Sequence, residues 1–273
     1  MHSIIPEKLS NALNIFETPK FMITRDASGE PNIALVMTWT VYDKNRLVYG
    51  DFMTYKSRMN LIDGNSKMAL LVMTTDLNSW LIKSDFESYH KNDEIYEYIA
   101  TTPLFKYNQY TNARGAGLAE ARWISPEYSI SKLNVLSGYL KAKLAARGVS
   151  YNETEEGNMP RPVMDRFSKM AAVKILSFIG EDGYPEAFPA FGIVPAHRNS
   201  LTVNRTEENR RGYHLSEGQR VAISLVTLEP AAFQVKGVFR EVSSKSGIVE
   251  VDRVYACSLP RPGERIDIPL VKT

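Results

Sequence analysis

The chain has few of the residues on which several kinds of protein chemistry depend. Among 273 residues there is one cysteine, Cys257, and there are four histidines. A single cysteine excludes an internal disulfide and any metal site built from several thiolates. The histidines, His2, His90, His197 and His214, show no spacing typical of metal ligands. We therefore expect no metal site.

Long apolar runs and an excess of one charge are also absent. No apolar run approaches about 18 residues, and the N-terminal segment MHSIIPEKLSNALNIF lacks a basic stretch followed by an apolar core. The 33 basic and 31 acidic residues leave a net charge of +2, which gives no support for a nucleic-acid or membrane surface. We expect a cytoplasmic protein that binds neither.

An internal repeat is the most informative feature that is present. Residues within 20–125 recur later in the chain at nearly constant offsets of 154 or 153. Matched pairs include Gly29 and Gly183, Leu47 and Leu201, Ala69 and Ala222, and Lys83 and Lys236. The block GLAEARWI matches GIVEVDRV at an offset of only 130, so the first copy carries an insertion. A period this long predicts two tandem copies of one domain rather than a solenoid.

Each copy contains short β-branched and aromatic runs separated by turn residues. The strands expected in the first copy are Phe21–Thr24, Ile33–Val41, Arg46–Gly50, Lys67–Thr74, Trp80–Ser88 and Gly117–Ile124. Those expected in the second are Ala172–Phe178, Glu186–Ile193, Ser200–Asn204, Arg220–Thr227, Ala232–Glu241 and Gly247–Tyr255. Six antiparallel strands per copy predict a mainly β protein made of closed barrels, because closure removes exposed edges.

Four helices are predicted between these strands. One short helix in each copy, Tyr55–Asp63 or Glu207–Ser216, is followed by a glycine, a common helix stop. Asn92–Thr101 lies in the insertion, and Ile130–Arg147, with leucines at helical spacing, is expected to bridge the domains. The predicted organisation is a domain at 1–128 with an insertion at about 89–116, a connecting helix and linker at 129–162, and a domain at 163–273.

The start of the first short helix gathers groups that suit a phosphate. Thr54, Lys56, Ser57 and Arg58 offer hydroxyl and cationic donors beside the helix N-terminus, and no acid in the cluster is expected to oppose them. A solvated helix face is the alternative. The second copy has Arg205, Arg210 and Arg211 there, but also Glu207 and Glu208, which would repel a phosphate and predict a weaker site.

The string GDFMTYKSRMNLIDGNSKMALLVMTTDLNSWLIKSDF resembles the core of the pyridoxamine 5′-phosphate oxidase-like, FMN-binding split β-barrel family. The resemblance covers both copies, roughly residues 15–125 and 165–260, and rests on the order of elements. It implies two tandem six-stranded split β-barrels forming a pseudo-dimer, with two possible grooves for FMN between them. Because Glu207 and Glu208 enter only the second copy and only the first carries the insertion, we expect at most one tightly bound flavin per chain.

The resemblance also implies roles for individual residues. Thr54, Ser57 and Arg58 match the phosphate corner, and Lys56 shares that role if the register shifts by one. The residues expected near the flavin ring are Met37, Thr38, Trp39, Trp80 and Lys83 from the first copy, and Gln234 and Lys236 from the second.

The resemblance predicts the kind of cofactor and leaves the substrate open. The C-terminal tail lacks the histidine of authentic pyridoxamine phosphate oxidases, so the chain is predicted to be a different flavin-dependent oxidoreductase, whose substrate and electron donor the sequence leaves open. The expected cofactor is FMN, with the deazaflavin coenzyme that some members of this superfamily bind as the alternative. A non-catalytic flavin, deazaflavin or haem carrier is the alternative, with His90, His197 or His214 as the only imidazole ligands for haem. Aromatic residues of the insertion either cap the flavin groove, pack a helix against the barrel, or form an oligomer surface.

Overall fold

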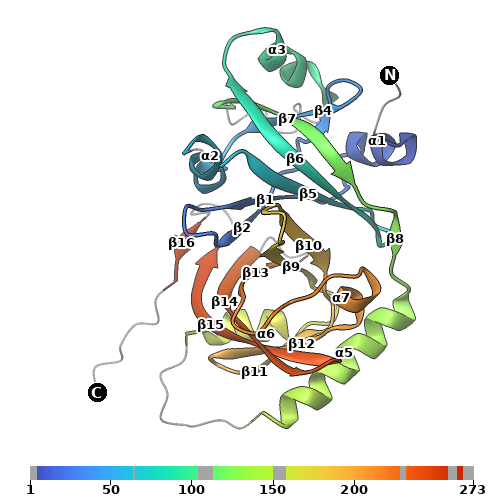
Figure 1. Cartoon of the computed structure of the whole chain (residues 1–273), viewed down its shortest axis with the longest axis vertical. Coiled ribbons are helices and arrows are strands. Elements are labelled where there is room, and N and C mark those ends of the chain that lie inside the picture. The colour runs from blue at the N-terminus through green and yellow to red at the C-terminus, as the bar shows by residue number, and fades with distance from the viewer. Residues whose placement is uncertain are drawn as a thin grey trace. The chain divides into compact units, whose positions relative to one another are not determined.

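The computed structural model describes residues 5–63, 65–103, 113–149, 158–227, 232–257 and 263–266. The chain divides into two compact units (Figure 1). Unit 1 comprises residues 1–129 and 179–187, and unit 2 comprises residues 130–178 and 188–273. The predicted connecting helix therefore belongs to unit 2. Most of the predicted linker, residues 150–157, lies outside the described residues. The pairing of the two copies as a pseudo-dimer, and any further homo-oligomer, stays a prediction.

Unit 1 is built on one antiparallel sheet. Its strands are β1 (Lys20–Arg25), β2 (Pro31–Leu35), β3 (Thr40–Val41), β4 (Arg46–Asp51), β5 (Lys67–Met73), β6 (Asn78–His90), β7 (Gly115–Ile124) and β8 (Tyr128–Ser129). They are ordered β2-β1-β5-β6-β7-β4-β3, and β8 pairs with β6.

The second sheet repeats this order. Its strands are β9 (Val173–Ile179), β10 (Pro185–Pro189), β11 (Ile193–His197), β12 (Ser200–Asn204), β13 (Arg220–Val226), β14 (Ala232–Ser243), β15 (Ser246–Ala256) and β16 (Glu264–Arg265). The order β10-β9-β13-β14-β15-β12-β11 matches that of the first sheet strand for strand. The chain is mainly β, as predicted, and the shared order is the one that duplication predicts.

Two details of the strand prediction are wrong. Each sheet has eight strands rather than six, and both sheets are open rather than closed barrels. The predicted strand Ile33–Val41 is split into β2 and β3 because the Thr38 hydroxyl takes the place of backbone pairing: it accepts from the Gly50 N–H at 3.1 Å and donates to the Gly50 carbonyl at 2.9 Å.

Six helices are described. They are α1 (Glu7–Asn14), α2 (Tyr55–Ile62), α3 (Glu94–Thr101), α5 (Lys132–Arg147), α6 (Arg161–Phe167) and α7 (Thr206–Arg210). The sequence predicts α2, α3 and α5 closely but does not predict α1 or α6. α7 is shorter than expected because Gly212 adopts a left-handed conformation, with φ of 69°, that stops the helix.

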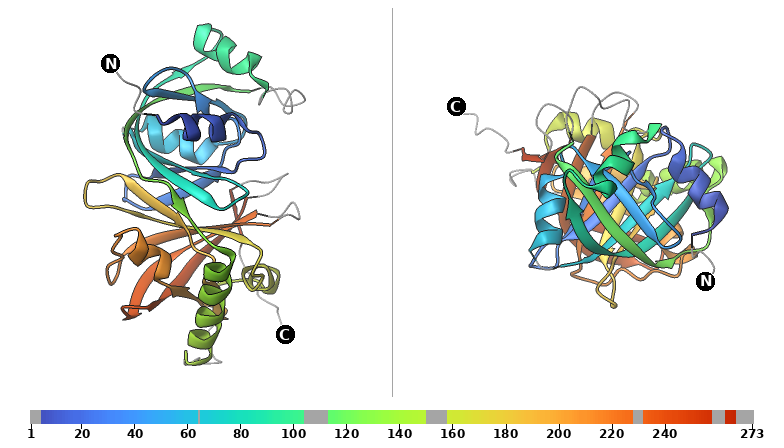
Figure 2. Two further views of the ribbon diagram at one scale, coloured as in Figure 1. Left: turned by 90° about the vertical axis from the view of Figure 1, so that its right-hand side faces the viewer. Right: turned by 90° about the horizontal axis from the view of Figure 1, so that it is seen from above.

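The leucines of α5 do not form its buried face. Gly138 and Ala142 are buried where α5 packs on β11 and β12, whereas Leu133 and Leu144 are 77% and 63% exposed. Figure 2 shows α5 lying along the outside of its sheet. The small residues allow a close approach to the sheet, so the helical spacing of the leucines predicts the helix correctly and its buried face wrongly.

Both units contain a fully buried lysine at equivalent positions. In unit 1, the Lys20 ammonium donates to the carbonyls of Ile15 and Met37, both at 3.0 Å. In unit 2, the Lys174 ammonium donates to the Lys169 carbonyl at 3.1 Å. Burial lowers the pKa of Lys20 to about 8 and that of Lys174 to about 7. We call each of these arrangements a lysine clasp.

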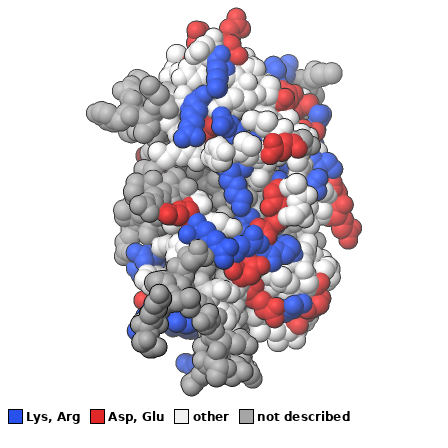
Figure 3. All heavy atoms as spheres, turned by 90° about the vertical axis from the view of Figure 1, so that its left-hand side faces the viewer, with Lys and Arg blue, Asp and Glu red and all other residues white. Residues whose placement is uncertain are grey.

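No helix in the described part of the chain is long and apolar enough to cross a membrane. On the face drawn in Figure 3, cationic and anionic side chains are interspersed, in keeping with the small net charge.

Candidate functional site

The predicted phosphate residues of unit 1 lie where β4 passes into α2. We call Asp51, Thr54, Lys56, Ser57 and Arg58 the first corner. Thr54 precedes α2, but its side chain does not cap the helix. The first turn of α2 therefore presents backbone N–H groups without a side-chain cap, an arrangement that favours anions.

A buried carboxylate occupies this corner. Asp51 has no exposed surface, and its Oδ1 accepts hydrogen bonds from the Thr54 N–H at 3.0 Å and the Thr54 hydroxyl at 2.6 Å. Its Oδ2 accepts from the Tyr89 hydroxyl at 2.9 Å and lies 3.9 Å from the Arg58 Nε. The expectation of a corner unopposed by acid is therefore wrong. An Asp three residues before Thr54, in the position of a turn acceptor, is the signal that could have revealed it.

Arg58 is only partly satisfied by the protein. Its side chain is 21% exposed, and its guanidinium lies 5.4 Å from the Tyr89 ring and 6.0 Å from the Tyr55 ring. The Nε atom is buried and has no hydrogen-bond partner among the described residues. Since an unpaired buried donor is costly, Arg58 is suited to receiving an anion.

The two hydroxyls of the predicted phosphate site face inward. Ser57 is almost completely buried and accepts a hydrogen bond from the Asn32 amide at 3.1 Å, while the Thr54 hydroxyl donates to Asp51. Lys56 is half-buried on the same turn. The structure brings all four residues together, but only Lys56 and Arg58 combine positive charge with partial exposure.

Two glycines of β7 make room for the tyrosines beside Asp51. A Cβ atom at Gly117 would lie 2.2 Å from the Tyr49 ring, and one at Gly115 would lie 2.6 Å from the Tyr89 ring. Burial raises the pKa of the Tyr49 hydroxyl. Burial, together with the hydrogen bond to Asp51, raises the pKa of the Tyr89 hydroxyl to about 12. At neutral pH both tyrosines are therefore protonated.

The residues expected to flank a flavin ring are largely interior in unit 1. Trp39 and Trp80 belong to the hydrophobic core, and the Trp39 indole lies 4.4 Å from the Tyr49 ring. Thr38 is buried against Gly50, as described above. Met37 is half-buried, and its carbonyl accepts from the Lys20 clasp. Their contact with a flavin stays a prediction.

Lys83 is held by two acids within unit 1. Its ammonium lies 2.7 Å from Asp182, 2.5 Å from Glu186 and 5.3 Å from the centre of the Trp123 ring. Burial alone would lower the pKa of Lys83, but the hydrogen bonds to the two carboxylates outweigh it and raise the pKa. Asp182 and Glu186 belong to the segment 179–187 and were not predicted as partners of Lys83.

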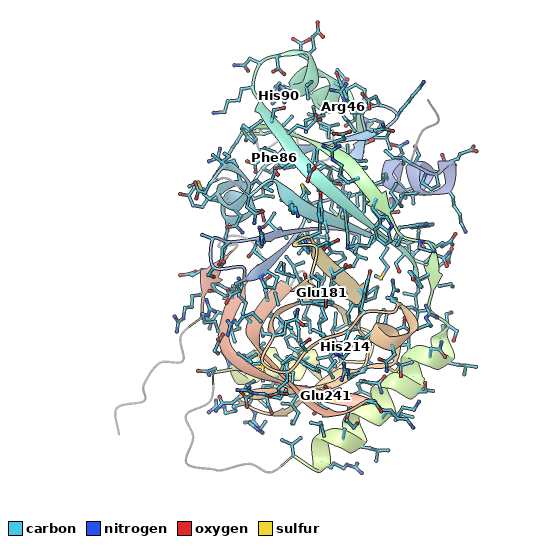
Figure 4. The ribbon with its side chains drawn as sticks, in the orientation of Figure 1. Arg46, Phe86, His90, Glu181, His214 and Glu241 are labelled. Atoms are coloured by element: carbon cyan, nitrogen blue, oxygen red, sulfur yellow. The ribbon has the colours of Figure 1, made fainter. Side chains whose placement is uncertain are left out.

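The second corner, where β12 passes into α7, is closed by its own ion pairs. Arg205, 3% exposed at its side chain, binds the fully buried Glu208 through two hydrogen bonds of 2.8 and 2.6 Å. It also lies 2.8 Å from Glu241, which Figure 4 labels. Arg210 and Arg211 lie 3.3 and 3.7 Å from Glu207. The arginines of this corner are thus neutralised by the neighbouring acids.

Gln234 and Lys236, expected to reach toward the flavin, lie on β14 and are buried. The Lys236 ammonium is 6.0 Å from the centre of the Tyr255 ring. Contact between these side chains and a cofactor anchored by the first corner stays a prediction.

The histidines considered as haem ligands are in unlike surroundings. His90, labelled in Figure 4 near α3, uses both ring nitrogens, at 2.6 Å from the Ser88 hydroxyl and 2.7 Å from Asp93. The His197 Nδ1 accepts from the Asn199 N–H, and His214 is exposed after α7. The described residues contain no group of three or more His, Cys, Asp or Glu side chains that could hold a metal ion.

The insertion packs a helix against the sheet of unit 1. Ile99 of α3 is fully buried beside Val48, Ala116 and Leu118. The Tyr98 hydroxyl donates to the Val41 carbonyl at 2.8 Å. These contacts favour the packing role for this part of the insertion. Its aromatic residues Phe105, Tyr107 and Tyr110 lie outside the described residues.

No protein-family model and no curated protein matches the chain. Among solved structures, it is similar to an FMN-binding protein from Syntrophomonas wolfei, with 17% identity over 46% of this chain and 87% of the other, at a TM-score of 0.38. It is also similar to a Clostridium acetobutylicum protein of the pyridoxinephosphate oxidase family, with 18% identity over 44% and 85% of the two chains, at a TM-score of 0.36. An F420 reductase is 13% identical over 44% and 98%, with a TM-score of 0.35.

Proposed function

We propose that the chain is a flavin-dependent oxidoreductase that holds the phosphate of FMN at the first corner. The observation that carries this proposal is the buried Arg58 Nε, which has no hydrogen-bond partner among the described residues and lies at the uncapped start of α2. Anions are favoured at such a helix terminus, and a guanidinium can bind a phosphate through two hydrogen bonds.

The residues of the corner have separate roles in this proposal. Arg58 donates hydrogen bonds to the phosphate, and Lys56 adds a second positive charge on the same turn. Thr54 and Ser57 shape the corner through their internal hydrogen bonds rather than binding the ligand directly. When bound, the isoalloxazine supplies hydride and electron transfer, and the protein supplies position and hydrogen bonding.

A carrier without turnover is the second candidate. The ion pairs of Lys83 with Asp182 and Glu186 favour this candidate, because Lys83 is a side chain that was expected to face the flavin. Under this alternative the chain binds FMN, a deazaflavin or haem without a redox substrate. Anaerobic reduction of the FMN-loaded protein by NADH or NADPH, followed through the visible flavin band, supports the oxidoreductase. A flavin that neither nucleotide reduces favours the carrier.

Titration of the full chain with FMN tests the site. Arg58→Ala is expected to weaken binding by about 1.5–3 kcal/mol, or one to two decades in Kd, because it removes a charge-assisted hydrogen bond. Arg210→Ala is the matched control in the second corner, where the arginine is one-third exposed and pairs with Glu207. Unchanged affinity in Arg58→Ala together with a loss in Arg210→Ala would move the site to unit 2.

A further inference from the structure

We infer that the outward face of α5 is a docking surface for an anionic lipid bilayer. Four leucines make up this face, and we call it the leucine face: Leu133, Leu136, Leu140 and Leu144. The inference goes beyond the proposed function and is independent of it, because it concerns a helix of unit 2 and requires no flavin.

The leucine face points away from the unit that carries it. Its side chains are 77%, 43%, 50% and 63% exposed in chain order. Successive helical residues are turned by about 100°, so the four leucines lie within about 80° of one another, opposite the buried Gly138 and Ala142. Figure 2 shows α5 along the outside of unit 2. The leucines therefore form an apolar strip roughly 17 Å long in contact with solvent, as at interaction sites.

Only positive charges accompany the leucine face. The helix sequence KLNVLSGYLKAKLAAR contains no acid. At the same helical spacing, Lys132 and Lys143 lie on one side of the strip, Lys141 lies on the other, and Arg147 lies at its end, all of them exposed. Long basic side chains can lay their stems on an apolar layer and keep their charges at the lipid headgroups. Each cation near an anionic bilayer strengthens binding roughly fivefold.

The spacing of the leucines favours a flat partner over a partner helix. The strip continues from Leu140 to Leu144, which keeps it straight along a straight helix. A heptad seam would continue from Leu140 to Lys143 instead. A partner helix wound around α5 would therefore meet the Lys143 ammonium in the seam, where an apolar residue is preferred. A bilayer surface accepts a straight apolar strip with cations on both sides.

Two other occupants suit the leucine face less well. A second copy of α5 would bring the cations of two helices together without an acid from either, and like charges repel. Residues 150–157, which follow α5, include three glutamates but no aliphatic side chain that could cover the leucines. An anionic bilayer supplies both the apolar depth and the negative charge. The balanced charge of the whole chain, from which no membrane surface is expected, conceals this local excess of cations.

Flotation of the full chain with lipid vesicles tests the inference. One set of vesicles contains phosphatidylcholine with roughly one quarter phosphatidylserine, and the other contains phosphatidylcholine alone. We expect the chain to bind the anionic vesicles at least about tenfold more tightly than the neutral ones. Added salt should weaken this preference, because it screens the charges.

Substitutions on α5 assign the binding to the leucine face. Leu133→Gln and Leu140→Gln keep a good helix former and remove apolar surface, so each should weaken vesicle binding at least about fivefold. Lys141→Gln should weaken binding to the anionic vesicles alone. Leu35→Gln is the matched control, since it removes a leucine that is 41% exposed on β2 of unit 1, and it should leave binding unchanged.

Several outcomes would overturn the inference. They are no binding to the anionic vesicles, equal binding to both kinds of vesicle, and equal losses in Leu140→Gln and Leu35→Gln. A dimer in sedimentation that Leu140→Gln dissociates would assign the face to a second copy and overturn it too. Thermal melts check that the variants fold, and if one does not, the comparison of vesicles on the wild-type chain decides. FMN titration of the same variants should be unchanged, so failure of the proposed function is seen separately.

Discussion

The two corners share a backbone design and differ in where the arginine finds its partner. In unit 1, Arg58 lies within α2, is partly exposed, and approaches Asp51 only to 3.9 Å. In unit 2, Arg205 precedes α7, is buried, and binds Glu208 through two short hydrogen bonds. It also donates to the Leu215 carbonyl at 3.1 Å. Arg205 uses its donors in close hydrogen bonds within unit 2, so few of them remain for a ligand. Arg58 approaches its acid less closely, so its donors stay available.

The largest expected difference between the corners is in stability. Glu208→Ala leaves the buried Arg205 guanidinium without its main partner and should lower the free energy of unfolding by about 3–5 kcal/mol. Asp51→Ala should cost less, about 1–3 kcal/mol, because the partly exposed Arg58 can be hydrated. Urea unfolding measures both.

Tryptophan fluorescence assigns these effects to a unit, since Trp39, Trp80 and Trp123 all lie in unit 1. Glu208→Ala should shift the circular-dichroism transition more than the fluorescence transition. Equal losses in the two variants would mean that the corners do not differ in how tightly they are closed.

A smaller effect is expected from adding a methyl group beside each corner. Gly117→Ala forces a Cβ to within 2.2 Å of the Tyr49 ring and should destabilise unit 1 by about 1–3 kcal/mol. Gly138→Ala, on α5 near Asn204, meets its nearest neighbour only at 3.7 Å. It should be neutral or stabilise unit 2 by up to about 1 kcal/mol through helix propensity. Thermal melts of the two variants check this, and a stable Gly117→Ala would show that Tyr49 can move away.

The smallest effect concerns the lysine clasps. Burial lowers the folded-state pKa of Lys174 to about 7 and that of Lys20 to about 8. Above these values the folded chain binds fewer protons than the unfolded chain, so stability rises with pH until the unfolded lysines titrate. Between pH 7 and 8 we expect a gain of about 1 kcal/mol per pH unit for Lys174, with Lys20 following at higher pH.

Lys174→Met is expected to flatten this rise, and denaturation at a series of pH values measures it. Lys20→Met provides the comparison in unit 1. Stability that falls from pH 7 to 8 in the wild-type chain would contradict the assignment of the clasps as buried, weakly basic groups.

Local patterns predict much of the fold and only part of the corner. Alternating runs and turn residues locate nearly every long strand, and the repeat predicts that the two sheets share one order. The split of β2 from β3 depends on the Thr38 hydroxyl reaching Gly50, which is distant in sequence. The exposed leucines of α5 likewise follow from its close packing through Gly138, which spacing alone does not reveal.

At the corner, residue types predict the cluster but not its partners. Thr54, Lys56, Ser57 and Arg58 do come together, because they share one helix start. The Asp51 carboxylate that opposes their positive charge is held by a hydrogen bond from the Tyr89 hydroxyl of β6. Two glycines of β7 leave the room that the neighbouring tyrosine rings need. Such contacts between strands are set by register, and a single sequence does not specify register at this level of detail.

Unit 1 is made of two separate segments of the chain, so it cannot be completed until the second segment has been synthesised. Residues 1–129 supply most of the unit, yet the acids that neutralise Lys83 belong to residues 179–187, about fifty positions later. At roughly 5–20 residues per second, a ribosome needs several seconds to add that stretch. A nascent chain released or paused in this interval carries the first sheet with Lys83 still lacking both acids. Translation speed between Ser129 and Ala187 thus sets how long that incomplete intermediate persists.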